Sequence, residues 1–227
     1  VGPSGSGKTT TLTLAGALEE PKSGCVCFEG KDIREIGYTR YRNSKIGIVF
    51  QAYNLLPYLT PLENVLAAME ITSNPIKNKK ERARELLTRM GITEDQMKRN
   101  INKLSGGEQQ KARIAMALAQ KTDILLLDEP TTYLDMAHQL DLMEMLQEIN
   151  DQYGITIVMV LHDLQQAAAY SHHMIALKGG CLIDQGKPKE LLTASFLQKV
   201  YNITAKIHFD EDYPVIIPQL KQRRLIV

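Results

Sequence analysis

The sequence lacks three features that would each point to a particular class of protein. It has no excess of charge, since 27 lysines and arginines stand against 26 aspartates and glutamates. It has only three cysteines among 227 residues, and no apolar run approaches the roughly 18 residues of a membrane span. These absences argue against a nucleic-acid partner, a disulfide framework and a membrane-spanning segment. A chain of this length can bury a full core without disulfides.

The few cysteines predict no metal site. Cys25 and Cys27 alternate within a segment of strand character and therefore point to the same side of it, but no further ligand lies near them in the sequence. We expect a reducing, cytoplasmic setting for the chain. The neighbouring His172 and His173 are interpreted as polar residues that lead into a strand.

A complete phosphate-binding loop of the pattern G-x-x-x-x-G-K-[ST] opens the chain. Glycines let its backbone N–H groups turn toward a polyphosphate, while Lys8 adds a positive charge and Thr9 offers a hydroxyl to Mg²⁺. A helical stretch from Thr10 directs its N–H groups and positive dipole end at the same phosphates. The predicted nucleotide-binding residues are Gly2, Pro3, Ser4, Gly5, Ser6, Gly7, Lys8, Thr9 and Thr10.

The loop leaves two questions open. The motif alone does not distinguish a kinase, a GTPase and an ATPase. The alternative interpretation of these Gly and Ser residues is a flexible turn that binds no phosphate, and the helix that follows argues against it. Such a loop normally follows a buried strand, and only Val1 precedes it here. We therefore expect at least one strand upstream of Val1.

Short strand-like runs alternate with helical stretches along the chain, which predicts a mostly parallel α/β core flanked by helices. Core strands are expected at residues 46–50, 124–128 and 155–161, the last two with apolar runs of the kind buried on both faces. Residues 61–103 carry charged helical patterns instead. An amphipathic helix is expected after Asp135, with Leu140, Met143, Leu146, Ile149 and Tyr153 on its apolar face.

The string Leu104-Ser105-Gly106-Gly107-Glu108-Gln109-Gln110 precedes a long helical stretch. Ser105 and the two glycines come just before a long helix expected from Glu108 to about Ala119, and they predict a second helix N-terminus that can accept an anion. One triphosphate hardly needs two such sites from one subunit, so a head-to-tail dimer with two shared sites is the natural arrangement. A simple capped helix is the alternative for this string taken alone.

The string resembles the signature motif of ATP-binding cassette (ABC) proteins, and the resemblance runs from Gly2 to about Pro218. It implies a P-loop NTPase fold as a single domain over residues 1–227, with a helical signature subdomain at about residues 61–120. The segment 124–129 resembles the Walker B strand, which places Asp128 in the Mg²⁺ shell and Glu129 beside the attacking water.

Three more positions match the family in order. Gln51 is similar to the glutamine that touches Mg²⁺ and water and senses the membrane partner. His162 resembles the switch histidine near the γ-phosphate, and Asp135 lies in a segment that resembles the D-loop of the dimer interface. The resemblance thus implies catalytic Glu129, His162 and Gln51, Mg²⁺ held by Thr9, Gln51 and Asp128, and an ATPase that requires ATP and Mg²⁺.

Different segments of the chain resemble different kinds of transporter. Residues 46–65 resemble ATPases of lipoprotein-release and macrolide or antimicrobial-peptide exporters, whereas residues 114–120, 128–139, 161–167 and 186–190 resemble those of iron-siderophore, haem and cobalamin importers. A mosaic gene is one hypothesis for this division. We favour import and keep export, a soluble ABC ATPase of translation or repair, and a module without hydrolysis as alternatives. Import implies transmembrane permease subunits, a substrate-binding protein and a peripheral position on the cytoplasmic face of the plasma (inner) membrane.

Overall fold

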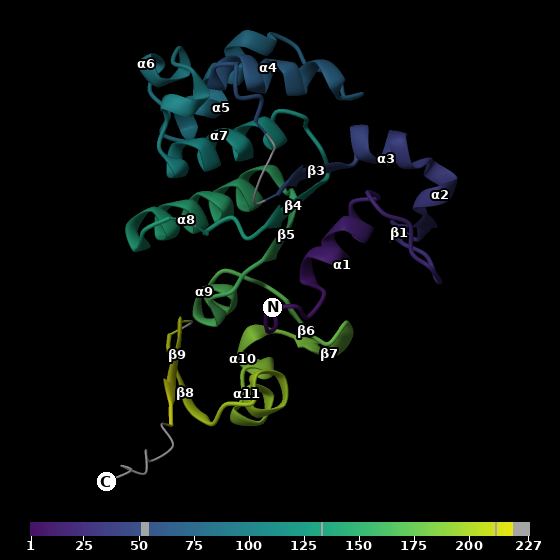
Figure 1. Cartoon of the computed structure of the whole chain (residues 1–227), viewed down its shortest axis with the longest axis vertical. Coiled ribbons are helices and arrows are strands. Elements are labelled where there is room, and N and C mark those ends of the chain that lie inside the picture. Colours follow the sequence, from purple (N-terminus) through teal and green to yellow (C-terminus); the bar gives the residue numbers. More distant parts are fainter. Residues whose placement is uncertain (51–54, 133, 212, 220–227) are drawn as a thin grey trace. The chain divides into compact units, whose positions relative to one another are not determined.

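A computed structural model describes residues 1–50, 55–132, 134–211 and 213–219. Its contacts divide the chain into two compact units. Residues 10–160 form the sheet unit, and residues 1–9 together with 161–227 form the loop unit. Figure 1 labels the elements along the chain.

The sheet unit is built on three parallel strands in the order β3-β4-β5. These are β3 (Ile46–Val49), β4 (Ile124–Asp128) and β5 (Thr156–Val160), which confirms the three predicted core strands and the α/β class. The central strand β4 is the most buried, with Leu125, Leu126 and Leu127 all at most 3% exposed. A parallel strand with neighbours on both sides and apolar side chains on both faces is expected to be buried in this way.

Strand β5 differs from the prediction that both of its faces are buried. Val158 is 43% exposed and Thr156 is also exposed, whereas Ile157 and Met159 are half-buried. Side chains alternate between the two faces of a strand, so the face of β5 that carries Thr156 and Val158 is exposed along most of its length, and only Val160 at its end is buried. The apolar run alone could not distinguish a strand covered on both faces from a strand covered on one.

Helix α1 (Lys8–Ala15) packs against the sheet, where Leu12 joins Ile46 and Leu126 in one buried cluster. The hairpin of β1 (Cys27–Phe28) and β2 (Lys31–Asp32) leads into the helices α2 (Ile33–Ile36) and α3 (Tyr38–Ser44). Phe28, Ile33 and Tyr41 from these elements join the cluster, which Ala17 and Val160 complete. The hydroxyl of Tyr41 donates to the carbonyl of Ala15 at 3.1 Å, so α3 is tied to the end of α1.

All the regular secondary structure within residues 61–118 is helical. The elements are α4 (Pro61–Ile71), α5 (Lys79–Arg89), α6 (Glu94–Met97), the 3-10 helix η1 (Ile101–Lys103) and α7 (Gly106–Leu118). Helix α7 contacts α4, α5 and β3, and so connects this helical stretch to the sheet (Figure 1). The boundaries of a helical subdomain at 61–120, and of one domain over 1–227, stay predictions.

Helix α8 (Met136–Tyr153) confirms the predicted amphipathic helix, with Met143, Leu146 and Ile149 buried. Leu140 and Tyr153 are 37% and 39% exposed, so their predicted place on the buried face is wrong. The Tyr153 ring instead lies 5.6 and 5.2 Å from the guanidinium carbons of Arg82 and Arg89. Cations over an aromatic face hold the ring at the surface.

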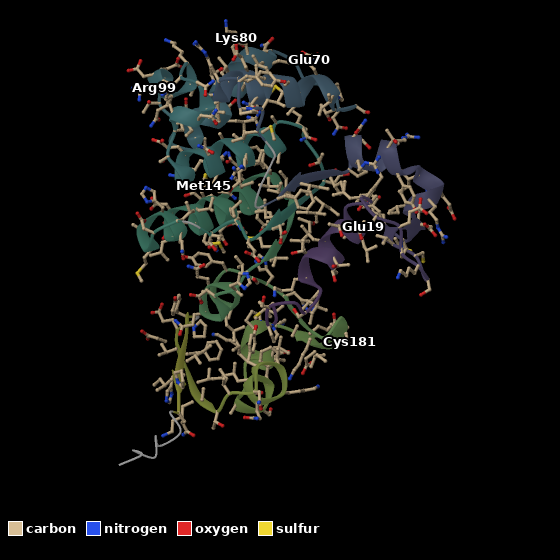
Figure 2. The ribbon with its side chains drawn as sticks, viewed as in Figure 1. Glu19, Glu70, Lys80, Arg99, Met145 and Cys181 are labelled. Atoms are coloured by element: carbon tan, nitrogen blue, oxygen red, sulfur yellow. The ribbon has the colours of Figure 1, made fainter. Side chains whose placement is uncertain are left out.

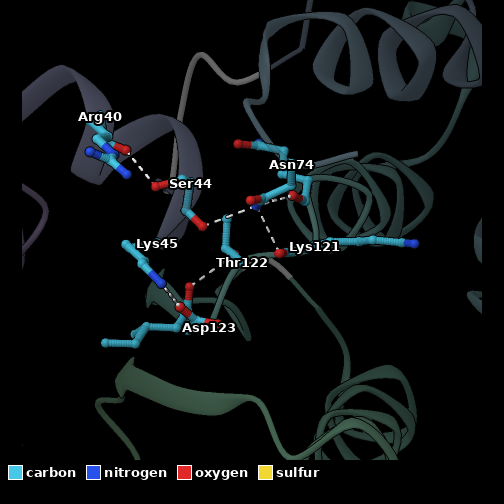
Figure 3. A network of polar contacts seen from close by, with 9 residues as sticks. Arg40, Ser44, Lys45, Asn74, Lys121, Thr122 and Asp123 are labelled. Atoms are coloured by element: carbon cyan, nitrogen blue, oxygen red, sulfur yellow. Dashed lines mark hydrogen bonds and ion pairs between the residues drawn. The ribbon is translucent and has the colours of Figure 1, made fainter. Parts of the chain in front are cut away.

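A polar network lies at the N-terminal ends of β3 and β4 (Figure 3). The side-chain amide of Asn74 donates to the carbonyls of Ser44, Gln120 and Lys121 at 2.9–3.0 Å. The ammonium of Lys45 bonds the carboxylate of Asp123 at 2.8 Å. Because Asn74 follows α4, these bonds tie the segment after that helix to the residues just before the two strands.

The loop unit contains α9 (Leu164–Ala169), the hairpin β6 (Met174–Lys178) and β7 (Cys181–Gly186), α10 (Pro188–Leu191), α11 (Ala194–Tyr201) and the hairpin β8 (Ala205–Asp210) and β9 (Tyr213–Pro218). The predicted turn at Gly179 and Gly180 is confirmed between β6 and β7. Among the residues that the structure describes, no helix has the length and apolar character to cross a bilayer.

Candidate functional site

The phosphate loop lies in the loop unit and is curled around the side chain of Lys8. The Lys8 ammonium donates to the carbonyls of Gly2 and Pro3, both at 2.8 Å, and lies 3.5 Å from the Ser6 hydroxyl. Lys8 is 8% exposed, so its charge is buried and held by the loop's own oxygens. A buried ammonium beside neutral carbonyl acceptors is electrostatically suited to a polyanion.

Glycine is required at the entrance of the loop. A Cβ atom at Gly2 would lie 2.1 Å from the carbonyl oxygen of Leu177 on β6, and Gly2 has a φ of 147°. The N–H of Gly180 donates to the carbonyl of Ser6 at 3.1 Å. The β6–β7 hairpin therefore supports the loop at both ends, through residues that lie far from it in the sequence.

Tyr201 is a supporting residue that the sequence did not indicate. Burial raises the pKa of its hydroxyl to about 12, and a hydrogen bond to the backbone of Gly2 acts in the opposite direction. This tyrosine stands at the C-terminal end of α11. No motif links a tyrosine at this distance to a phosphate loop, so only the folded chain reveals the contact.

Asp128 and Glu129 lie at the C-terminal end of β4 in the sheet unit, where the predicted Walker B strand places them. Asp128 is 6% exposed. Glu129 has a φ of 51°, a left-handed conformation that costs a residue with a Cβ about 1–2 kcal/mol. Its N–H donates to the carbonyl of Val160 at 3.1 Å, and its carboxylate accepts from the Thr132 hydroxyl at 3.3 Å. Strain held by such bonds is typical of functional positions.

The signature string forms the start of α7, with Ser105 as its N-cap. The Ser105 hydroxyl accepts from the N–H of Glu108 at 3.3 Å, and the Glu108 carboxylate accepts from the N–H of Ser105 at 2.6 Å. A Cβ atom at Gly107 would lie 3.2 Å from a methyl carbon of Leu134. The structure thus brings the signature string beside the segment that resembles the D-loop.

Asp135 caps α8 and is exposed. Its carboxylate accepts from the N–H of His138 at 2.9 Å and lies 2.7 Å from that residue's Nδ1. The backbone bond first, and then the side-chain bond, hold the pKa of Asp135 below its ordinary value. The carboxylate is therefore ionised at neutral pH.

The remaining predicted residues fall in different places. His162 is exposed and follows β5 by two residues, in the loop unit. Ser4, Gly5, Thr9 and Thr10 are exposed along the loop and the start of α1. Gln51 lies outside the described residues. The phosphate loop and His162 thus belong to one unit, and Ser105, Asp128, Glu129 and Asp135 to the other.

The chemistry of the predicted Mg²⁺ ligands can be compared with what the ion prefers. In the described ranges, no three His, Cys, Asp or Glu side chains gather as a metal centre. Mg²⁺ usually binds one or two carboxylates together with substrate phosphates. The buried carboxylate of Asp128, in the sheet unit, is a ligand of that kind. The Thr9 hydroxyl, in the loop unit, is a neutral oxygen and stays a predicted ligand.

Comparison with known proteins gives one consistent result. A family model described as ABC transporter matches residues 1–132. The probable siderophore transport system ATP-binding protein YusV of Bacillus subtilis is 36% identical over 100% of this chain and 84% of its own. The ferric enterobactin transport ATP-binding protein FepC of Escherichia coli is 37% identical over 96% of this chain and 82% of its own.

A solved structure agrees with these relatives. The ATP-binding cassette MJ0796, in a dimeric post-hydrolysis state bound to ADP and Pi, is 36% identical to this chain. The match covers 82% of this chain and 83% of that one, with a TM-score of 0.74. The phosphate loop, the acidic pair at the end of β4 and the capped signature helix thus occur in a chain that belongs to the ABC transporter family and is one of its ATPase subunits.

Proposed function

We propose that this ABC ATPase powers the import of iron-siderophore complexes or of related haem- or cobalamin-type substrates. The observation that carries this proposal is the extent of the two import-system matches, which cover 96–100% of this chain. They include residues 46–65, the stretch that resembles exporters, as well as the importer-like stretches after residue 114. The exporter resemblance of residues 46–65 stays a prediction.

The loop residues supply binding of the triphosphate. In the structure, Lys8 is held by the carbonyls of Gly2 and Pro3, and we infer that it exchanges these neutral acceptors for phosphate oxygens when ATP binds. A charge-assisted bond to phosphate is stronger than one to a carbonyl. The N–H groups of the loop and of the first turn of α1 orient the phosphates.

Hydrolysis needs a positioned water and stabilised charge more than covalent help. We assign the orientation of the attacking water to the Glu129 carboxylate, which its left-handed backbone and its bond to Thr132 hold in place. His162 would donate to a γ-phosphate oxygen, and Gln51 would contact the water. Bound Mg²⁺, held by Thr9 and Asp128, would neutralise charge on the phosphate oxygens.

The start of α7 is assigned to the nucleotide of a second subunit. The related MJ0796 cassette is a dimer, and a two-fold axis would close the Ser105, Gly106 and Gly107 N-terminus of each copy on the other's ATP. Asp135 and Leu134, which lies against Gly107, would then lie at the same interface. The two copies would work on permease subunits at the cytoplasmic face of the membrane, together with a substrate-binding protein.

The experiment compares Glu129→Gln with Glu148→Gln in the intact transport system of the native cell. Both changes remove one carboxylate, and Glu148 is exposed on α8, outside the proposed site. Loss of a general base or water-positioning group costs about 100-fold or more in rate. Glu129→Gln should therefore abolish uptake of radioactive iron given as a ferric siderophore, whereas Glu148→Gln should leave uptake at the wild-type rate.

Two outcomes would contradict the proposal. If Glu129→Gln leaves iron uptake intact and instead makes the cells sensitive to a macrolide, the system exports. If purified Glu129→Gln protein hydrolyses ATP with its permease at the wild-type rate, the assignment of Glu129 is wrong whatever the substrate.

A further inference from the structure

Two cysteines of the sheet unit lie side by side on an exposed surface. The sulfur atoms of Cys25 and Cys27 are 3.7 Å apart, and both residues are exposed. The residues that alternate with them face inward: Val26 is half-buried, and Phe28 is 8% exposed within the cluster that packs α1 against the sheet. The alternation predicted from sequence thus places both thiols on the solvent face.

We propose that Cys25 and Cys27 form a reversible intramolecular disulfide by exchange with a small-molecule disulfide. The sulfur atoms are already in contact. Neither cysteine is among the residues assigned to nucleotide binding or hydrolysis. The thiol pair would be reduced in a reducing cytosol and would become oxidised when low-molecular-weight disulfides accumulate, as is typical of the transient disulfides of cytosolic proteins.

The exchange proceeds in two balanced steps. The thiolate of one cysteine attacks a sulfur atom of the small disulfide, so that one thiolate leaves and a mixed disulfide remains on the protein. The second cysteine loses its proton to water, attacks the protein sulfur of the mixed disulfide and releases the second small thiolate. The protein loses two electrons and two protons, and the small disulfide becomes two thiols.

The contact between the two sulfur atoms also affects the acidity of Cys27. The hydrogen bond to Cys25 is the largest cause that raises the pKa of the Cys27 thiol, with burial, Cys25 and Asp32 adding to it and Arg34 opposing it. The same contact places either thiol within reach of a mixed disulfide formed on the other. Asp32 and Arg34 are paired with each other across a 2.5 Å contact.

The local backbone favours a bond that is easily reduced. Residues two apart in an extended strand have Cα atoms about 6.6 Å apart, near the upper end of the span of roughly 4.4–6.8 Å that disulfides bridge. Gly24 precedes the pair with a φ of 79°, and nothing lies within 4 Å of where its Cβ would be. The segment can therefore contract, at a cost in strain that makes the disulfide labile.

The experiment treats the purified full chain with oxidised glutathione and maps the cysteines by mass spectrometry. Trypsin releases one peptide, residues 23–31, that carries both cysteines. Cys181, which Figure 2 labels, lies in another peptide. We expect the 23–31 peptide to become lighter by two hydrogen atoms and to regain them with dithiothreitol. Cys181, which is also exposed, serves as an internal control and should carry a glutathione adduct instead.

Single variants distinguish the mechanism. Cys27→Ser should trap a glutathione adduct on Cys25, and Cys25→Ser should trap one on Cys27, because neither variant has the second thiol that displaces glutathione. Cys181→Ser should leave formation of the internal disulfide unchanged. Separate adducts on both cysteines in the wild-type chain, or a disulfide between either of them and Cys181, would overturn the proposal.

Discussion

Three helices of the sheet unit begin with the same local motif, and only one of them is assigned to a nucleotide. The capping boxes are Thr60 with Glu63 at α4, Thr93 with Gln96 at α6, and Ser105 with Glu108 at α7. In each box the N-cap hydroxyl accepts from the backbone N–H three residues later, and the side chain at that position accepts from the N-cap N–H. The motif therefore defines where a helix starts and does not by itself make an anion site.

The difference lies in the first two helical positions. At α4 the first position is Pro61, which has no N–H to offer. At α6 the first two positions are Glu94 and Asp95, whose carboxylates repel an anion. At α7 they are Gly106 and Gly107, which leave bare N–H groups at the positive end of a helix of 13 residues.

The cap hydroxyls differ as well. Those of Thr60 and Thr93 donate to the side chains of Glu63 and Gln96 at 2.9 and 3.0 Å. Among the described residues, Ser105 makes no bond of that kind. Its partner Glu108 is instead held by the side-chain amide of Gln96. The α7 cap therefore keeps a donor available for a phosphate oxygen, which the other two caps do not.

The largest expected effect tests the bare N–H groups of α7. Gly106→Asp places a carboxylate where the γ-phosphate of the partner's ATP would lie, as at α6, and should lower ATP turnover by about 100-fold. A Cβ atom at Gly106 meets nothing within 4 Å, and an acidic side chain in the first turn favours the helix. The loss should therefore appear in turnover of the transporter and not in urea unfolding.

The neutral isostere provides the control for this change. Gly106→Asn has nearly the same shape without the charge, so its turnover should stay within severalfold of the wild type. If the two variants hydrolyse ATP at the same rate, charge at the start of α7 does not matter, and the contrast between α7 and α6 has no functional meaning.

Sequence reasoning succeeded where a pattern is local. The apolar run before Asp128 predicted β4, and the Ser105 string predicted both the start of α7 and its cap. These signals lie within a few residues of the element that they specify.

Sequence reasoning failed where a feature depends on a residue far away in the chain or on a backbone angle. Nothing near Gly2 indicates that Leu177 and Tyr201 support it, and no motif announces the left-handed φ of Glu129. The exposed face of β5 and the arginines over Tyr153 depend on what packs nearby, which a single apolar run does not record. Tertiary contacts decide such features, and local composition does not contain them.

A smaller effect separates the role of a cap in stability from its role in catalysis. Ser105→Ala and Thr60→Ala each remove one cap hydroxyl and should each cost about 1 kcal/mol in the free energy of unfolding. Only Ser105→Ala removes a donor to the partner's nucleotide, so this variant should also lower ATP turnover, by about tenfold. Urea unfolding and steady-state hydrolysis of both variants measure the two effects separately. Equal turnover in the two variants would place Ser105 in the same structural class as Thr60.

The smallest expected effect is the response of the α4 cap to acid. The backbone N–H of Thr60 first, and then its hydroxyl, hold the pKa of Glu63 below its ordinary value of 4.5. A carboxyl group whose pKa is lower in the folded state stabilises the fold above its unfolded pKa, and this contribution is lost as the pH falls through the folded pKa. The urea midpoint of the wild type should therefore fall further between pH 7 and pH 3 than that of Glu63→Gln. The glutamine variant keeps a box of the kind that Thr93 and Gln96 form, without a titrating group. Glu81→Gln, in the first turn of α5 where no side-chain cap bond forms, should follow the wild type; if it behaves like Glu63→Gln, the acid response does not come from the cap.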